Sequence, residues 1–270
     1  MVAREFPEVV LVRNATNAGF ARANNQAARR ARGRYLFFLN NDTVVPPETL
    51  RLLIDYADAR PSVGILAPRL RDPRGRVQCS CRARPTLAAL FHRTLLLRWT
   101  GLFRRAYRRY RWRDGDAERA TEVEVVMGAA LMLPRRLFEA EGGWDEAFAF
   151  GGEDIDLCTR VARRHAVVYY PAAEIVHHGR ASSRLRPGYA HTQTFIGITR
   201  FLRKSGSPAW ALALYKAVVT AEAPLQWLGH AVRYAWQRLR GRRRTAARTL
   251  LTLRGLAHFL RRGLRAFWRV

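Results

Sequence analysis

Short apolar runs alternate with amphipathic stretches along the first two thirds of the chain. The runs are rich in valine, leucine and aromatic residues and lie at 8–13, 35–39, 63–67 and 166–170. Apolar runs of this length, bounded by glycine, proline or polar residues, predict buried strands of a parallel α/β sheet. Helical spacing with glycine or proline near the ends occurs at 21–32, 46–59 and 134–141. The alternation predicts an α/β fold.

The last third has a different pattern, in which leucine and aromatic residues alternate with arginine. Residues 193–270 are expected to be helical and basic, and 85–113 has the same composition. In the terminal helix one face is apolar, formed by Leu253, Leu256, Leu260, Leu264 and Phe267. The opposite face carries arginines. We therefore expect an α/β domain over 1–192 with a helical insertion at about 85–113, and a basic helical region over 193–270.

The charge is large and unevenly placed. The net charge of +27 comes almost entirely from arginine, because Lys204 and Lys216 are the only lysines. No acid occurs in 73–113, and Glu222 is the only acid in 175–270. Basic surface of this kind suits nucleic acid, anionic lipid or phosphorylated substrates. The hydrophobic content of 49% is that of a folded chain.

Neither export nor a membrane span is expected. The first residues are charged and contain no apolar signal core, and no window offers about twenty uninterrupted apolar residues. The chain is therefore expected in the cytoplasm.

Polar residues follow the apolar run of 35–39 directly. They are Asn40, Asn41 and Asp42. Ligands of α/β sheets bind at the carboxyl ends of strands, and an acid presented there can hold a divalent cation while substrate phosphates complete its shell. The alternative is an ordinary polar turn after a strand.

Two further polar clusters lie later in the chain. One is the group of acids Glu153, Asp154 and Asp156, at a predicted helix start where the helix dipole favours acids. The other is the pair His177 and His178, which ends an apolar run. Taken singly, the clusters are a helix cap and strand-end histidines. Together with Asp42 they predict one functional site.

Asparagines and small residues mark places where a ligand can approach the backbone. Asn24 and Asn25 lie in the first turns of the helix at 21–32, where free amides can face a nucleotide. Helix capping accounts for at least one asparagine. Gly128 and Ala129 interrupt the strand region 123–133 and leave room for a ligand.

Several of these segments match motifs of a known family. They are Asn17-x-Gly19-Phe20 with Asn24-Asn25, Leu39-Asn40-Asn41-Asp42, Gly142-Gly143-Trp144-Asp145-Glu146, Glu153-Asp154-x-Asp156-Leu157, and His177-His178-Gly179 with Ser182-Ser183. In order and spacing the chain from Phe6 to Ser183 resembles the family 2 glycosyltransferases, in their rhamnosyltransferase-like branch. The resemblance implies a GT-A fold. It also implies inverting transfer of a sugar from a nucleotide-diphosphate donor to a cell-envelope saccharide or lipid-linked acceptor.

The resemblance also implies roles for the matching residues. Asp42 and His177 would bind Mg²⁺ or Mn²⁺, with Asn40 replacing the first acid of the family's metal motif. Asp154 would be the general base, supported by Glu153 and Asp156. The donor would contact Asn17, Gly19, Phe20, Asn24, Asn25, Asn40 and Asn41. The acceptor side would include Gly128, Ala129, Trp144 and Asp145.

One departure from the family pattern concerns the N-terminal part. Family members normally begin with a βαβ unit that holds the base and ribose, and this chain starts at what resembles the third strand. The fold is therefore expected to be an N-terminally truncated GT-A sheet with two unpaired strand edges. Three alternatives follow: the true start lies upstream in the gene, a partner supplies the unit, or the chain is a noncatalytic remnant.

The basic charge also leaves a second class of function open, a nucleic-acid-binding protein. No zinc-ligand spacing and no compact recognition helix is evident, so nucleic acid is not expected as a partner. The segments 85–113 and 193–270 are instead expected to hold the protein on the anionic, cytoplasmic face of a membrane, with the leucine face of the terminal helix as the anchor.

Overall fold

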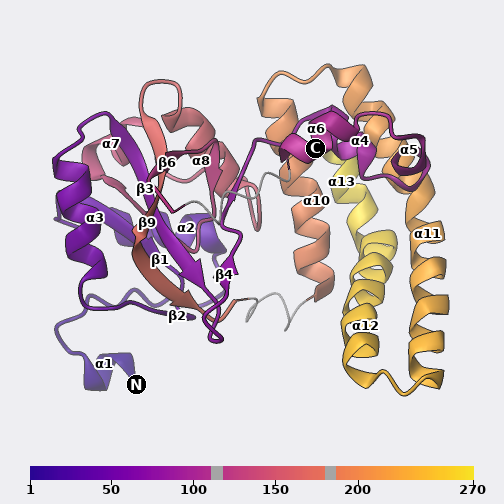
Figure 1. Ribbon diagram of the computed structural model, residues 1–270, viewed down its shortest axis with the longest axis horizontal. Coiled ribbons are helices and arrows are strands. Elements are labelled where there is room, and N and C mark those ends of the chain that lie inside the picture. The colour runs from indigo at the N-terminus through magenta and orange to yellow at the C-terminus, as the bar shows by residue number, and fades with distance from the viewer. Residues whose placement is uncertain (111–117, 180–186) are drawn as a thin grey trace.

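The computed structural model describes residues 1–110, 118–179 and 187–270, and the helices of the C-terminal part stand beside an α/β unit (Figure 1). The strands are β1 (Tyr35–Leu39), β2 (Thr43–Val44), β3 (Val63–Arg71), β4 (Val77–Gln78), β5 (Cys81–Arg82), β6 (Thr121–Glu122), β7 (Val125–Val126), β8 (Ala130–Pro134) and β9 (Ala166–His177). The helices before β9 are α1 (Val2–Glu5), α2 (Phe20–Ala28), α3 (Thr49–Asp58), α4 (Leu87–His92), α5 (Leu95–Thr100), α6 (Arg104–Tyr110), α7 (Arg135–Ala140) and α8 (Glu153–Val161). The later ones are α10 (Pro187–Lys204), α11 (Ala209–Leu239), α12 (Arg243–His258), the π-helical turn η2 (Phe259–Gly263) and α13 (Leu264–Arg269).

The main sheet is mixed rather than parallel. Within the described ranges its order is β1-β8-β3-β9-β2, with β4 beside β3 and β6 beside β9. Strands β3 and β9 run parallel, whereas β8 is antiparallel to both β1 and β3. The prediction that β1 belongs to a parallel sheet is therefore wrong. A continuous apolar run indicates burial on two faces, and such burial does not determine strand direction.

Both faces of the sheet are covered by helices. Because alternate residues of a strand point to opposite faces, Leu36 and Phe38 join the core formed with α2, α7 and α8. Tyr35 and Phe37 pack on the other side, in the core beneath α3. The same alternation in β3, β8 and β9 supplies the two cores, so the sheet is held between two helical layers.

The predicted strand at 8–13 is absent. These residues follow α1 without regular structure, and Val9, Val10 and Leu11 are exposed. A strand is stable only when a neighbour accepts and donates its backbone hydrogen bonds, and no described strand pairs with this segment. Strand β1 lies at an edge of the sheet, with β8 as its paired neighbour.

The second part of the molecule is a helical unit with its own core. Leu90 of α4, residues of α10 and α11, and Phe259 and Phe267 form one cluster of buried side chains. The insertion that begins at 85 and the C-terminal helices therefore belong to one packed body. Helix α10 begins at Pro187 and crosses the predicted domain boundary at 192/193 without a break.

The apolar face of the terminal helices is packed inside this unit. Leu253, Leu256 and Phe267 are buried, and Leu260 and Leu264 pack against the same cluster. The prediction that this face anchors the chain to a membrane is wrong, because α10 and α11 already cover it. Across the described ranges, the helices are either too short or too polar to cross a bilayer.

Candidate active site

Asp42 and His177 meet at the end of the sheet. Strand β2 pairs with the end of β9, with Thr43 opposite His177, and the His178 amide donates to the Asp42 carbonyl at 2.8 Å. This pairing brings Asp42 Oδ1 within 3.4 Å of His177 Nε2. The two side chains are 17% and 7% exposed. Residues 135 positions apart are thus joined at the edge where the resemblance places a metal.

Gln78 of β4 fixes the orientation of the imidazole. Its Nε2 donates to the His177 carbonyl at 2.6 Å, so its Oε1 faces His177 Nδ1 at 2.9 Å. An amide oxygen can only accept, so Nδ1 must carry the proton. In the neutral ring Nε2 then presents a lone pair toward the Asp42 carboxylate. Two facing acceptors need a proton or a cation between them.

A divalent cation fits this pair of ligands. Two ligands about 2.1 Å from one ion, at angles between 90° and 110°, lie roughly 3.0–3.4 Å apart. Metal-bound histidines commonly donate their second ring N–H to an oxygen, as His177 does to Gln78. Among the described residues no group of three or more His, Cys, Asp or Glu surrounds a metal position. Substrate phosphates and water would therefore have to supply the other ligands.

A short loop links this strand end to the acids of α8. The Asn40 amide donates to the Ala129 carbonyl at 2.9 Å. A Cβ placed on Gly128 would lie 3.5 Å from Phe20 Cζ and 3.7 Å from Asp154 Cβ. The loop at 127–130 therefore brings the Asn40 turn, the start of α2 and the start of α8 together.

Asp154 is held by an arginine that the sequence reasoning missed. Arg82 Nη2 donates to both carboxylate oxygens of Asp154, at 3.1 and 2.9 Å, and the Ile155 amide donates to Oδ1 at 2.9 Å. Asp154 is mostly buried and faces the Gly128 loop. The arrangement fixes the direction of this carboxylate.

Glu153, the preceding acid, has a different environment. Burial and the adjacent charge of Asp154 raise the pKa of Glu153 to about 7. Its Oε2 is buried and, within the described part of the chain, has no hydrogen-bond partner. Glu153 therefore exchanges a proton near neutral pH, whereas the Asp154 carboxylate is paired with the Arg82 guanidinium.

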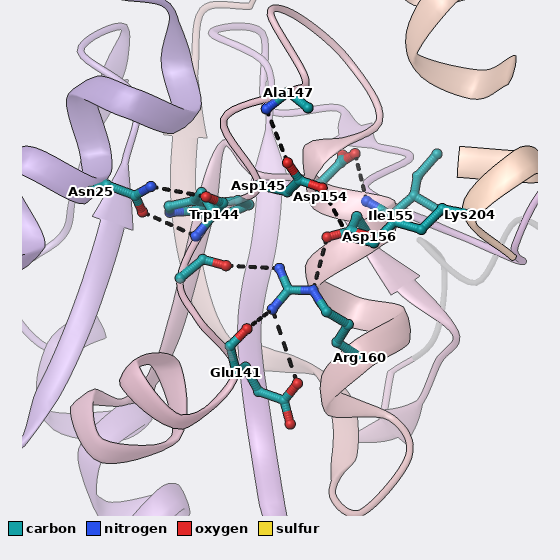
Figure 2. A network of polar contacts seen from close by, with 11 residues as sticks. Asn25, Glu141, Trp144, Asp145, Ala147, Asp154, Ile155, Asp156, Arg160 and Lys204 are labelled. Carbon is teal, nitrogen blue, oxygen red and sulfur yellow. Dashed lines mark hydrogen bonds and ion pairs between the residues drawn. The ribbon is translucent and has the colours of Figure 1, made fainter. Parts of the chain in front are cut away.

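Asp156 serves the packing of the fold (Figure 2). Arg160 Nε donates to its Oδ2 at 2.8 Å, and Lys204 Nζ lies 2.7 Å from its Oδ1. Arg160 also donates to the carbonyls of Glu141 and Gly143. Lys204 is the last residue of α10, so this buried carboxylate ties the helical unit to the α/β unit.

Asp145 shares the same lysine, at 2.8 Å. Although burial opposes the shift, the hydrogen bond from Lys204 lowers the pKa of Asp145. Its Oδ1 also accepts from the Ala147 amide. The acceptor-side role of Asp145 stays a prediction, since these contacts hold it in a structural network (Figure 2).

Asn25 and Trp144 also hold each other (Figure 2). The Asn25 amide donates to the Trp144 carbonyl at 2.9 Å and to Glu146 at 3.0 Å, and its oxygen accepts from the Trp144 amide. The Trp144 ring is 1% exposed and packs against Phe20 and Phe38. Donor contact by Asn25 and acceptor contact by Trp144 stay predictions, because both side chains are committed to the core.

The remaining donor-side residues lie at the start of α2. The Asn17 side chain accepts from the Gly19 amide, which closes the turn, and Gly19 has a φ of 81° that favours glycine. Asn24 donates to the Phe20 carbonyl. Asn41 is exposed at the strand end. Ser182 and Ser183, from the last matching motif, lie outside the described residues.

Three residues of the site carried no motif in the sequence: Gln78, Arg82 and Lys204. Gln78, Ser80 and Arg82 alternate with apolar or cysteine positions, which is the available signal that one side of this segment faces a polar site. Lys204 is one of two lysines in an arginine-rich chain, and that rarity is its own signal.

Comparison with known proteins decides the family. The model of "Glycosyl transferase family 2" matches residues 1–139. The chain belongs to glycosyl transferase family 2. It is 28% identical over 242 residues to N-acetylglucosaminyl-diphospho-decaprenol L-rhamnosyltransferase of two Mycobacterium tuberculosis strains, covering 83% of this chain and 73% of that protein.

Two further proteins are similar to this chain. An O-antigen biosynthesis protein of Myxococcus xanthus is 33% identical over 172 residues, which cover 60% of this transferase and 12% of that protein. A mannosyltransferase of Pyrobaculum calidifontis, solved with GDP-Man and Mn²⁺, aligns with a TM-score of 0.44 at 21% identity. The alignment covers 99% of this chain and 71% of that one.

Proposed function

We propose that this transferase moves a sugar, with inversion, from a nucleotide-diphosphate donor to a lipid-linked saccharide of the cell envelope. Family membership supports the reaction type. The name of the mycobacterial relative suggests rhamnose as the sugar and a polyprenyl-diphosphate saccharide as the acceptor. The expected fold of such an enzyme is the GT-A fold, and the mixed sheet covered on both faces is compatible with it.

The observation that carries the proposal is the pair Asp42 and His177 with the ring orientation fixed by Gln78. The pair would hold Mg²⁺ or Mn²⁺. A bound divalent cation stabilises the negative charge that grows on a departing diphosphate. The pair lies at the strand end that also carries Asn40 and Asn41, where the donor is expected.

Asp154 is the proposed general base. A base must first be placed within reach of the acceptor hydroxyl, and only then does its pKa matter. Asp154 faces the Gly128 loop between the donor-side turn and the strand end, and Arg82 fixes its direction. Glu153 would tune the site through its own charge, which changes near pH 7.

Replacement of Asp42 tests the donor site. We expect Asp42→Ala to abolish metal-dependent donor binding and turnover, while the fold survives, because Asp42 lies at the sheet edge and is partly exposed. Calorimetry measures the binding of the uridine, guanosine and thymidine diphosphate sugars in the presence of Mn²⁺. The release of nucleoside diphosphate from the same donors measures turnover. Asp55→Ala, an exposed acid of α3, is the matched control. Turnover of Asp42→Ala equal to that of the control would exclude the site.

We further propose that α11 rests on the cytoplasmic face of a membrane. Exposed apolar residues follow one another along its outer side: Trp210, Leu214, Leu225, Leu228, Val232 and Leu239. At 100° per residue they fall within an arc of about 60° along a helix about 45 Å long. Trp99 of the neighbouring α5 is 88% exposed. An apolar stripe of this length on a surface helix is typical of a lipid or protein contact.

The charge around the stripe favours anionic lipid. Glu222 is the only acid in 175–270 and it is buried, so the outer surface of α10 to α13 has no negative side chain. Arginines near a membrane surface contribute roughly 1 kcal/mol each. Arg240 and Arg242 also lie over the ring of Trp236, which is itself exposed.

Charge placed on the stripe tests this surface. We expect Leu228→Glu to reduce flotation with phosphatidylglycerol vesicles at least fivefold, because it puts an acid against an anionic, apolar boundary. Leu50→Glu, an exposed leucine of α3 in the α/β unit, is the matched control and should float like the unmodified chain. Equal flotation of both variants would place the membrane contact elsewhere, and a salt-sensitive shift of DNA in a gel would favour the nucleic-acid alternative.

A further inference from the structure

The helical unit contains a cavity of about 200 Å³. Its walls come from α10, α11, α12 and η2, and α4 lies across one side. Half of the wall residues are apolar and buried, among them Ile198, Tyr215, Val219, Ala223 and Phe259. The volume exceeds the ~150 Å³ of an apolar cavity that takes up benzene. A space of this kind is suited to a stretch of hydrocarbon.

Polar side chains also line the cavity. Arg93 and Thr194 are among them and are exposed, so the cavity reaches solvent beside these two residues. His191 also lines it, and its Nε2 is buried without a hydrogen-bond partner in the described residues. Glu222 also lines the cavity, is buried and accepts from the Leu95 amide at 2.8 Å. The cavity thus combines an apolar interior with a cationic entrance.

The entrance adjoins the candidate active site. A Cβ placed on Gly151 would lie 3.5 Å from Thr194 Oγ1, so a residue lining the cavity touches the loop directly before Glu153. One turn further along α10, Gly197 allows the helix to contact the Gly151 backbone, and any larger residue would collide with it. The cavity and the acids of α8 are therefore neighbours across a single loop.

We propose that this cavity binds the apolar chain of the lipid-linked acceptor, with its phosphate groups at Arg93 and His191. The acceptor class rests on the proposed function, whereas the cavity and its charge do not. A chain seated there would anchor the acceptor one loop away from Asp154. Acceptor specificity would come from the cavity volume that the apolar chain fills. A saccharide without such a chain would lose this contribution to its binding affinity.

Filling the cavity from its wall tests the tail site. Ala223→Leu adds bulk to the buried side of α11, and Ala213→Leu adds the same bulk on the exposed side of that helix. The probe is farnesyl diphosphate, titrated by calorimetry with EDTA present so that a metal-held diphosphate does not contribute. We expect Kd to rise at least tenfold in Ala223→Leu and to stay unchanged in Ala213→Leu. Equal Kd values in the two variants would overturn the proposal.

A variant at the entrance covers the case in which Ala223→Leu does not fold. Arg93 is exposed, so Arg93→Gln leaves the core intact. It should weaken farnesyl diphosphate about threefold to tenfold and leave farnesol binding unchanged, because only the former has phosphates. An equal loss of affinity for farnesyl diphosphate and farnesol, or no loss for either, would contradict the assigned orientation.

Kinetics separates this proposal from the proposed function. The unmodified chain is compared with Ala223→Leu on N-acetylglucosaminyl diphosphates that carry either a farnesyl or a methyl group. KM should rise at least tenfold for the farnesyl acceptor alone. An equal change for both acceptors overturns the tail site. If neither acceptor receives a sugar, the transferase proposal is refuted. The cavity site still stands in that case, provided that farnesyl diphosphate binding depends on Ala223 and not on Asp42.

Discussion

The α/β unit and the helical unit differ in how many acids they offer to their arginines. In the α/β unit acids meet arginines: Arg82 holds Asp154, Arg160 holds Asp156, and Arg71 holds Glu174 at 2.7 Å. From α10 to the end of the chain, Glu222 is the one acid in the sequence and it is buried. The arginines there far outnumber this one carboxylate.

The difference shows where the net charge acts. Paired charges in the α/β unit contribute to the geometry of the candidate site, and their fields largely cancel at a distance. In the helical unit the arginines outnumber the acids and leave a positive surface around an apolar stripe. The net charge of +27 therefore describes the helical unit far better than it describes the site.

The strongest way to sharpen this comparison is to replace the paired acid and its unpaired neighbour in turn. Asp154→Asn should lower kcat by about two to four orders of magnitude, because it removes the base and keeps the shape. Glu153→Gln should lower kcat less than tenfold and remove an inflection near pH 7 from the pH–rate profile. Steady-state rates from pH 5 to 9 measure both. An active Asp154→Asn beside an inactive Glu153→Gln would reverse the roles.

A second prediction breaks the buried network of Figure 2. Arg160→Met should lower the free energy of unfolding by about 3–5 kcal/mol, because two carbonyls lose their donor and Asp156 keeps only Lys204. Denaturant unfolding measures the loss. Arg163→Met, an exposed arginine just beyond α8, should change stability by less than about 0.5 kcal/mol. Similar losses in both variants would mean that the network adds no stability.

The smallest expected effect concerns the charge of Glu153. Its pKa is about 7 in the folded chain against an ordinary value of 4.5, so the unfolded chain releases this proton first. Stability must then fall as pH rises from 4.5 to 7. Glu153→Gln should gain about 1–3 kcal/mol over the unmodified chain at pH 8 and nothing below pH 4.5, allowing for its partial exposure. A gain that is constant with pH would have another origin.

The sequence predicts the local placement of the polar clusters, whereas their roles stay predictions. Asn40 to Asp42 do follow a strand, the acids at 153–156 do begin a helix, and His177 does reach Asp42. These features are local, since a strand end or a helix start is set by neighbouring residues. The cations that hold the acids were missed, because Arg82 is 72 positions from Asp154 and Lys204 is 48 and 59 positions from Asp156 and Asp145. Only the fold brings these residues together.

The faces of the helices were the part that the sequence could not decide. The terminal helices have a clear apolar face, and that face is packed. Helix α11 carries apolar residues on more than one side, so its pattern alone does not show that Leu225 and Leu228 are outside while Ala223 is inside. An amphipathic pattern indicates that a face is covered, and tertiary contacts decide by what. The edge position of β1 likewise depends on partners far along the chain.

The contact of Lys204 with Asp145 and Asp156 has a consequence for chemical labelling. The chain has two lysine side chains, and Lys216 is buried. Burial opposes protonation of Lys204, yet its two carboxylates raise its pKa, so the amine stays protonated and reacts slowly with acylating reagents while α10 is docked. When α10 separates from α8 the amine becomes an ordinary nucleophile. The rate of acylation at this one position therefore reports how often the two units come apart.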